Sequence, residues 1–296
     1  MSRWGGRTVA VTAVLVAGLL VEAEAAQAAP VAVVRSVQPT ALVAPFPAVS
    51  PIGAALVGFG PVGTLVAAVA PVQSPEPPGT TADAVARGSA GSWAVGDVDR
   101  PVPTASLVKL YLAEGILATA RTAGTALPAE DLARIDAALT SSDDLAASEL
   151  WVAYDGPAVL ADVVARYDLQ GTSAPTPDPG AWGQTLTTAA DPARFLTELP
   201  DRAHPDDAEL LLGALSRATP AGADGFDQSF GLLGPGRSAG TAAKQGWMVL
   251  DGQRYLHSIG VVDDRVVVVL ATFPVDVVDW PAARAAVDAA AAALSR

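Results

Sequence analysis

The chain has 296 residues, of which 51% are hydrophobic and 17% charged, a balance typical of a folded protein and not of a disordered one. Its formal net charge of −13 would repel phosphate backbones, so we expect no nucleic-acid partner. Cysteine is absent and there are only two histidines, which excludes disulfides, thiol nucleophiles and metal centres built on several imidazoles.

Residues 1–28 have the pattern of a secretory signal peptide. Arg3 and Arg7 supply a basic start, residues 8–21 form an uncharged apolar run, and residues 23–28 offer small-residue cleavage patterns. We expect cleavage close to Ala28 and therefore a secreted or cell-envelope-associated protein. An uncleaved N-terminal anchor is the alternative that the pattern leaves open.

Residues 29–80 are rich in proline and alanine and carry no charge from Ser36 to Pro75. We interpret them as a linker, with a short apolar helix against the domain as a variant of this interpretation. The stretch Ile52–Ala70 is apolar enough to suggest a membrane contact, but several glycines and a proline argue against a spanning helix. A membrane contact through the N-terminal segment therefore stays open.

We expect one folded domain over residues 81–296, beginning with a strand near residues 92–98. A helix follows Thr104, which is a candidate N-cap, and brings Ser106 and Lys109 onto one face at i,i+3 spacing. A serine hydroxyl becomes a nucleophile when a nearby base takes its proton, and a desolvated lysine can serve as that base. The spacing predicts a hydrogen bond between this hydroxyl and this amine.

Two further segments place polar residues where a helix or a strand is predicted to begin. Ser142, Asp143 and Asp144 follow a helical stretch over residues 128–139 and are either a helix cap or part of a site. Lys244-Gln245-Gly246 begins a strand over residues 242–250, with a hairpin at 251–252 and further strands over 254–262 and 265–272. An alanine-rich helix capped by Asp279 ends the chain.

Lysine is rare in this chain: 16 of its 18 basic residues are arginine, and the two lysines are Lys109 and Lys244. Because arginine cannot lose its proton under ordinary conditions, a lysine kept in such a background suggests a chemical role.

The ordered set Ser106-x-x-Lys109, Ser142-Asp143-Asp144 and Lys244-Gln245-Gly246 resembles the S-x-x-K, S-D-N and K-T-G motifs of serine β-lactamases and penicillin-binding proteins. More narrowly, it resembles the class A β-lactamase-like serine hydrolases exported by actinobacteria. The resemblance implies an α/β (α+β) fold in which helices flank an antiparallel sheet and an all-helical subdomain is inserted at about residues 106–235.

The resemblance also implies roles. Ser106 would be the nucleophile, and Lys109 would be its general base or would hold the proton network around it. Ser142 would relay protons between the lysines and the leaving group. Lys244 would supply positive potential for Ser142 and for a substrate carboxylate. The backbone N–H groups of Ser106 and Trp247 would form the oxyanion hole.

The chain departs from the family pattern at three places. Asp144 stands where the family has an asparagine that touches substrate, and Gln245 replaces a threonine hydroxyl before Gly246. The stretch from Asp168 to Ala190, where class A enzymes carry a glutamate that activates the deacylating water, contains no glutamate. Asp178 would substitute only if this loop reached further inward, so we expect slow β-lactam turnover.

The other candidate residues have structural alternatives. His257, on the strand 254–262, either points toward the site or is a satisfied sheet residue, and His204 is expected at the surface. Trp151, Trp182 and Trp247 either line a groove or pack in the core.

With this resemblance, the sequence predicts a monomeric exported enzyme whose Ser106 is acylated by its substrate. The expected substrate is a small molecule or a cell-wall peptide with a D-alanyl or lactam-like carbonyl, and the resemblance implies no metal or organic cofactor. Three alternatives remain. The first is an esterase or amidase with the same Ser–Lys site, the second is a catalytically impaired envelope-binding protein, and the third is an unrelated secreted domain.

Overall fold

The computed structural model of the chain describes residues 63–71 and 93–295. The expected signal peptide and most of the expected linker lie outside these residues. In the described part of the chain, no helix is both long and apolar enough to cross a membrane.

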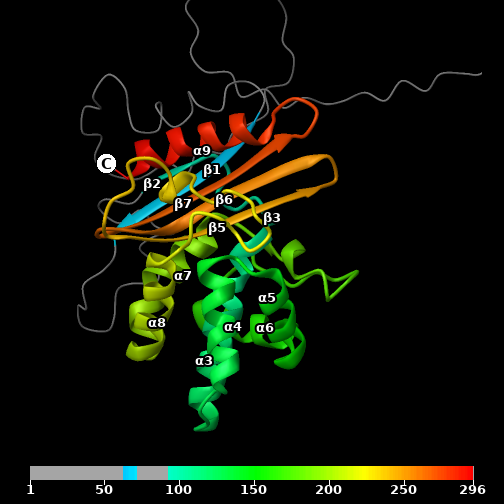
Figure 1. Cartoon of the computed structure of the whole chain (residues 1–296), viewed down its shortest axis with the longest axis vertical. Coiled ribbons are helices and arrows are strands. Elements are labelled where there is room, and N and C mark those ends of the chain that lie inside the picture. Colours follow the sequence, from blue (N-terminus) through cyan, green and yellow to red (C-terminus); the bar gives the residue numbers. More distant parts are fainter. Residues whose placement is uncertain (1–62, 72–92, 296) are drawn as a thin grey trace, which may run out of the picture. The chain divides into compact units, whose positions relative to one another are not determined.

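A five-stranded antiparallel sheet with the order β2-β1-β7-β6-β5 lies at the centre of the fold (Figure 1). Its strands are β1 (Thr64–Pro71), β2 (Trp93–Val95), β5 (Thr241–Leu250), β6 (Gln253–Val262) and β7 (Arg265–Pro274). A small second sheet pairs β3 (Val102–Pro103) with β4 (Leu186–Thr187).

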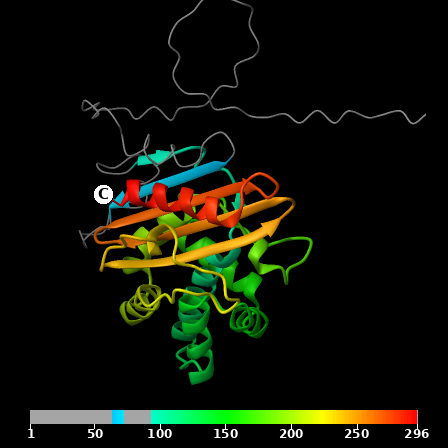
Figure 2. The same ribbon diagram turned by 45° about the horizontal axis from the view of Figure 1, so that its top comes forward.

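Helices cover both faces of the large sheet (Figure 2). One face packs against α9 (Trp280–Leu294). The helices on the other side are α3 (Val108–Ala123), α4 (Ala129–Thr140), α5 (Asp144–Ala153), α6 (Gly156–Tyr167), α7 (Ala190–Arg202) and α8 (Pro205–Ser216). Short 3₁₀ turns are η2 (Ala105–Leu107), η3 (Trp182–Gln184) and η4 (Gly231–Leu233).

Strand β7 is apolar from Val266 to Ala271, where both of its faces are covered. In β7, Val266, Val268 and Leu270 belong to the core shared with the α3–α8 helices. Val267 and Val269 belong to the core under α9. Successive side chains of a strand point to opposite faces, so two buried faces require an unbroken apolar run.

The predicted linker over residues 29–80 is wrong at residues 64–71, which form strand β1. Residues 64–71 pair with β7 over eight residues and lie between β7 and β2, whereas their sequence predicts a linker that ends at residue 80. The run was mistaken for an apolar linker because it lacks the alternation of a half-buried strand and has prolines on both sides.

The elements predicted after residue 240 are confirmed. Strands β5, β6 and β7 form the expected meander, and Asp279 caps α9 by accepting a hydrogen bond from Ala282 N. Thr104 is the N-cap residue of the 3₁₀ turn η2 but not of the helix α3, so the N-cap prediction is correct only in part. Its side chain makes no capping bond, and the chain passes through the 3₁₀ turn η2 before α3 begins at Val108.

A buried ion pair joins α3 to α6. Glu114 is 1% exposed and accepts two hydrogen bonds from Arg166, at 2.7 and 2.5 Å, and one from Tyr167 Oη at 2.9 Å. We expect Glu114→Gln to lower the free energy of unfolding by about 2 kcal/mol, measured by urea denaturation, because charge-assisted bonds in a buried place are lost. Glu149→Gln is the matched control: this half-exposed carboxylate pairs with Arg134 at 2.6 Å, and its loss should cost no more than about 0.5 kcal/mol. Equal losses in the two variants would contradict the expectation.

Candidate active site

Ser106 lies in the turn η2, at the junction of the sheet and the helices. The preceding residue, Ala105, has a φ of +47°, a conformation that non-glycine residues rarely adopt and that often marks functional sites. Strand β5 lies against this turn at Gly246, where a Cβ atom would stand 2.9 Å from Thr104 O and 3.2 Å from Leu107 Cγ. A glycine is therefore needed for β5 to approach the segment that carries Ser106.

Lys109, one turn later on α3, is buried and points at the start of α5. Its Nζ donates to Ser142 O at 2.5 Å and to Ser142 Oγ at 3.3 Å, and it forms an ion pair with Asp144 Oδ1 at 2.5 Å. Asp143 caps α5 by accepting from Ala146 N at 3.0 Å, which fixes the position of this junction. The structure therefore joins Lys109, Ser142 and Asp144 in one polar group.

Ser142 lies between the two lysines of the chain, each of which donates to its Oγ. Lys244 Nζ donates to Ser142 Oγ at 2.8 Å and to Gln245 O at 2.9 Å. Ser142 is buried and has a φ of +56°, so its backbone, like that of Ala105, is held in a rarely populated region. A hydroxyl in contact with two amines is suited to moving a proton between them.

Burial lowers the pKa of both lysines. The pKa of Lys109 is lowered by desolvation, which its hydrogen bond with Asp144 and the nearby carboxylate charges oppose. The pKa of Lys244 is held well below its ordinary value, first by desolvation and then by the charge of Lys109. Because Asp144 touches Lys109 and not Lys244, Lys244 is the amine for which the neutral form is more strongly favoured.

Two expectations about these residues are wrong. The predicted bond between Ser106 Oγ and Lys109 Nζ is absent from the described contacts, since Lys109 is directed to Ser142 and Asp144. Gln245, expected to bind substrate, is fully buried, and its amide donates to the carbonyl oxygens of Gln228 and Phe230. Its side chain therefore links strand β5 to the segment of Gln228 and Phe230 and does not line the pocket.

Ser106 lines a pocket of about 290 Å³. The wall is formed by the turn η2, by Asp144 at the start of α5, by residues 180–184 of the loop around η3, and by Trp247 and Met248 of β5. The structure thus brings Ser106, Asp144 and Trp247 to one cavity, with the two lysines and Ser142 buried beside it.

The loop before α7 contributes no carboxylate to this pocket. Trp182 and Gln184 line it, whereas Asp178, the suggested substitute for a glutamate, is exposed and accepts from Gly180 N at 3.0 Å. Of the weighed tryptophans, Trp182 and Trp247 line the pocket, and Trp151 is buried with its Nε1 donating to Pro179 O at 2.9 Å.

His257 is a satisfied sheet residue. It is fully buried on β6, where its Nε2 donates to Pro103 O at 2.9 Å and its Nδ1 accepts from Ala271 N at 3.3 Å. Only the neutral ring can make both bonds, and burial lowers its pKa to about 4. It ties β6 to the segment that leads into Ser106. His204 is half-exposed at the start of α8, as expected.

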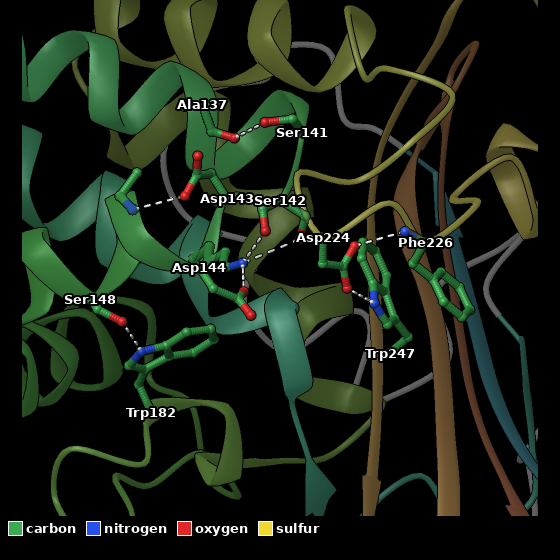
Figure 3. A network of polar contacts seen from close by, with 12 residues as sticks. Ala137, Ser141, Ser142, Asp143, Asp144, Ser148, Trp182, Asp224, Phe226 and Trp247 are labelled. Atoms are coloured by element: carbon green, nitrogen blue, oxygen red, sulfur yellow. Dashed lines mark hydrogen bonds and ion pairs between the residues drawn. The ribbon is translucent and has the colours of Figure 1, made fainter.

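Asp224 is a residue that the sequence analysis missed. Its Oδ2 accepts from Trp247 Nε1 at 2.9 Å and its Oδ1 accepts from Phe226 N at 2.9 Å (Figure 3). Phe226 in turn stacks on Trp247, with ring centroids 4.8 Å apart. Asp224 lies in an irregular stretch where no periodic pattern marks it, and its only signal is a turn-forming glycine on each side of the Ala-Asp pair.

Within the described residues, no group of three or more histidine, aspartate or glutamate side chains could hold a metal ion.

Comparison with curated proteins finds relatives of part of the chain. It is 35% identical over 165 residues to the protein named "Putative lipoprotein LppW" of Mycobacterium tuberculosis and of Mycobacterium bovis. The match covers 54% of this chain and 52% of the relative, so the chain spans about half the length of the curated relatives it matches. No protein-family model matches the chain.

Comparison with solved structures finds β-lactamases. The chain is similar to the TLA-3 extended-spectrum β-lactamase, with a TM-score of 0.65, 11% identity, and coverage of 83% of this chain and 97% of the other. It is similar to a class A β-lactamase from Bacteroides cellulosilyticus, with a TM-score of 0.63, 10% identity, and coverage of 83% and 97%. A β-lactamase from Sphaerobacter thermophilus gives a TM-score of 0.58, 15% identity, and coverage of 82% and 94%. The predicted fold is confirmed: the chain has the α+β fold of these enzymes.

Proposed function

We propose that this protein is an exported serine hydrolase that forms an acyl-enzyme on Ser106. One observation carries the proposal: Ser106 lines a pocket beside a Lys109–Ser142–Lys244 array that contains an amine with a strongly lowered pKa. Export, and residence at the cell envelope, rest on the pattern of residues 1–28 and on the name of the mycobacterial relative.

In this mechanism, Ser106 Oγ attacks the carbonyl carbon of an ester or amide. Its proton passes to the Lys109–Ser142–Lys244 array, and Ser142 then delivers a proton to the departing alkoxide or amine as the bond to the carbonyl carbon breaks. Water later cleaves the Ser106 ester, which releases the acid and regenerates the hydroxyl. Without a glutamate on the loop before α7, this second step is expected to be slow.

The geometry favours the esterase or amidase alternative over a D-alanyl peptide. A D-alanyl peptide ends in a carboxylate, which needs an accessible cation. Lys244, expected to supply that positive charge, is buried and donates to Ser142 and to a backbone carbonyl, whereas Asp144 lines the pocket.

Intact-protein mass spectrometry tests the nucleophile. After incubation with 4-nitrophenyl butyrate, we expect a butyryl adduct on the parent chain and none on Ser106→Ala, with the adduct persisting because deacylation is slow. A penicillin in a parallel reaction is expected to acylate more slowly, because it carries a carboxylate.

The control is the same ester with acid-unfolded protein, which reports nonspecific acylation. An adduct of equal yield on the parent and on Ser106→Ala, or none on either, would contradict the proposed function.

A further inference from the structure

The pocket beside Ser106 is lined by one charged group, and that group is negative. Among the described residues of its wall, Asp144 is the sole charged one, and 67% of its side chain is exposed. Its Oδ1 is paired with Lys109, while its Oδ2 has no hydrogen bond to a described residue. One carboxylate oxygen is therefore free to accept from a ligand.

Both lysines of the site are withdrawn from the pocket. The side chain of Lys109 is fully buried, and its Nζ is bound to Ser142 and Asp144. Lys244 is also buried, with its Nζ bound to Ser142 and to Gln245 O. A carboxylate that entered the pocket would meet the free Oδ2 of Asp144 and would find no accessible ammonium group to bind it.

Two indole rings form opposite parts of the same wall, one from the loop around η3 and one from β5. The N–H of Trp182 is directed to Ser148 Oγ at 3.1 Å, and the N–H of Trp247 to Asp224 Oδ2 at 2.9 Å. Figure 3 shows the two rings on either side of Asp144. The buried Nζ of Lys109 already lies over the Trp182 ring, 4.9 Å from its centroid. Since the N–H groups of both rings are occupied elsewhere, the rest of each ring contributes carbon and π-electron surface to the pocket wall.

Phe226 stacks on Trp247 and holds it in place. Asp224 adds a second carboxylate at the N–H edge of the same ring. Electron-rich ring faces combined with a carboxylate are the chemistry that recognises ammonium and quaternary ammonium groups. A rigid ring also needs no ordering when the ligand binds.

Given that Ser106 is the nucleophile of the proposed function, we propose that the acyl substrate carries a cationic group. This ammonium or quaternary ammonium group binds between Trp182 and Trp247 and has Asp144 as its counter-ion.

Three 4-nitrophenyl esters of matched length test the proposal: 4-(trimethylammonio)butanoate, its uncharged isostere 5,5-dimethylhexanoate, and hydrogen glutarate. For the full chain, we expect a Ser106-dependent kcat/KM at least about 10-fold higher for the cationic than for the uncharged ester, and lowest for the anionic one. The rates of nitrophenolate release also give the acylation step when deacylation is slow.

The variant Asp144→Asn should reduce the ratio of kcat/KM for the cationic and uncharged esters at least about five-fold. This ratio isolates the counter-ion role, because any effect on Lys109 changes the rates of both esters alike. Trp182→Leu should also reduce the ratio, and Trp182→Phe should keep most of it. Asp264→Asn, which removes a carboxylate from the β6–β7 turn, is the matched control and should leave it unchanged.

Binding to Ser106→Ala provides a readout that does not need turnover. Benzyltrimethylammonium should change the indole fluorescence saturably, and the change should shrink in the added variant Trp182→Phe, whereas phenylacetate should have no effect. Cation binding without Ser106-dependent hydrolysis would contradict the proposed function alone. Ser106-dependent hydrolysis that prefers the uncharged or anionic ester, or absence of cation binding to the folded variant, would overturn the cationic substrate.

Discussion

Replacing Lys244 by arginine is expected to lower the rate of Ser106 acylation by about 10³-fold at neutral pH, within the range that a general base contributes. Lys244 Nζ lies 2.8 Å from Ser142 Oγ in a fully buried position, and its pKa is held well below the ordinary value of a lysine. A neutral amine there can take a proton from the hydroxyl. A guanidinium stays protonated and cannot.

The substitution separates two roles of Lys244. If it acts as a permanent positive charge, as the family resemblance implies, Lys244→Arg would keep most of the rate. The measurement is the time course of the butyryl adduct, with thermal unfolding followed by circular dichroism to show that the variant is folded. A rate for folded Lys244→Arg within 10-fold of the parent would contradict the neutral-amine role.

The pH dependence of the parent chain tests the same point without a variant. A required neutral amine with a lowered pKa makes the acylation rate rise with pH through that pKa and level off before pH 10.5, the ordinary value for lysine. A required ammonium would make the rate fall over the same range. Since Lys109 and Lys244 both touch Ser142, the midpoint belongs to the coupled pair.

Much of the site could be predicted because lysine is rare in this chain. The chain has two lysines, and the two motifs that contain them, together with Ser142, marked the elements that the fold brings together. The direction of each side chain could not be predicted. An i,i+3 spacing puts Ser106 and Lys109 on one helix face, but η2 interrupts the helix and Asp144 supplies a stronger partner for the amine.

Gln245 shows that a residue's place in a motif does not predict what its side chain contacts. Its place between Lys244 and Gly246 suggested contact with substrate, yet its amide donates to the carbonyls of Gln228 and Phe230 in a segment distant in sequence. Burial of a polar side chain depends on which irregular segment crosses the strand, and no local pattern records that crossing. Strand β1 was missed for a related reason, because a strand buried on both faces has no alternation to detect.

Acidification from pH 6.5 to 4 is expected to lower the free energy of unfolding through His257 by about 3 kcal/mol. Burial lowers the pKa of His257 from 6.5 to about 4, and its Nδ1 accepts from Ala271 N, which only the neutral ring can do. The unfolded chain takes up this proton near pH 6.5, whereas the folded chain does so only near pH 4. Between these values the unfolded state binds more protons, so stability falls as the pH falls, and the loss is complete below pH 4.

The measurement compares the change in unfolding free energy between pH 7 and pH 4 in the parent and in His257→Gln. Other acid-titrating groups contribute equally to both, so the variant should lose about 3 kcal/mol less than the parent. An NMR titration of the His257 imidazole in the parent gives the same answer without a variant. A His257 ring that titrated near 6.5, or equal losses in the parent and in His257→Gln, would contradict the buried neutral state in which Nδ1 accepts from Ala271 N.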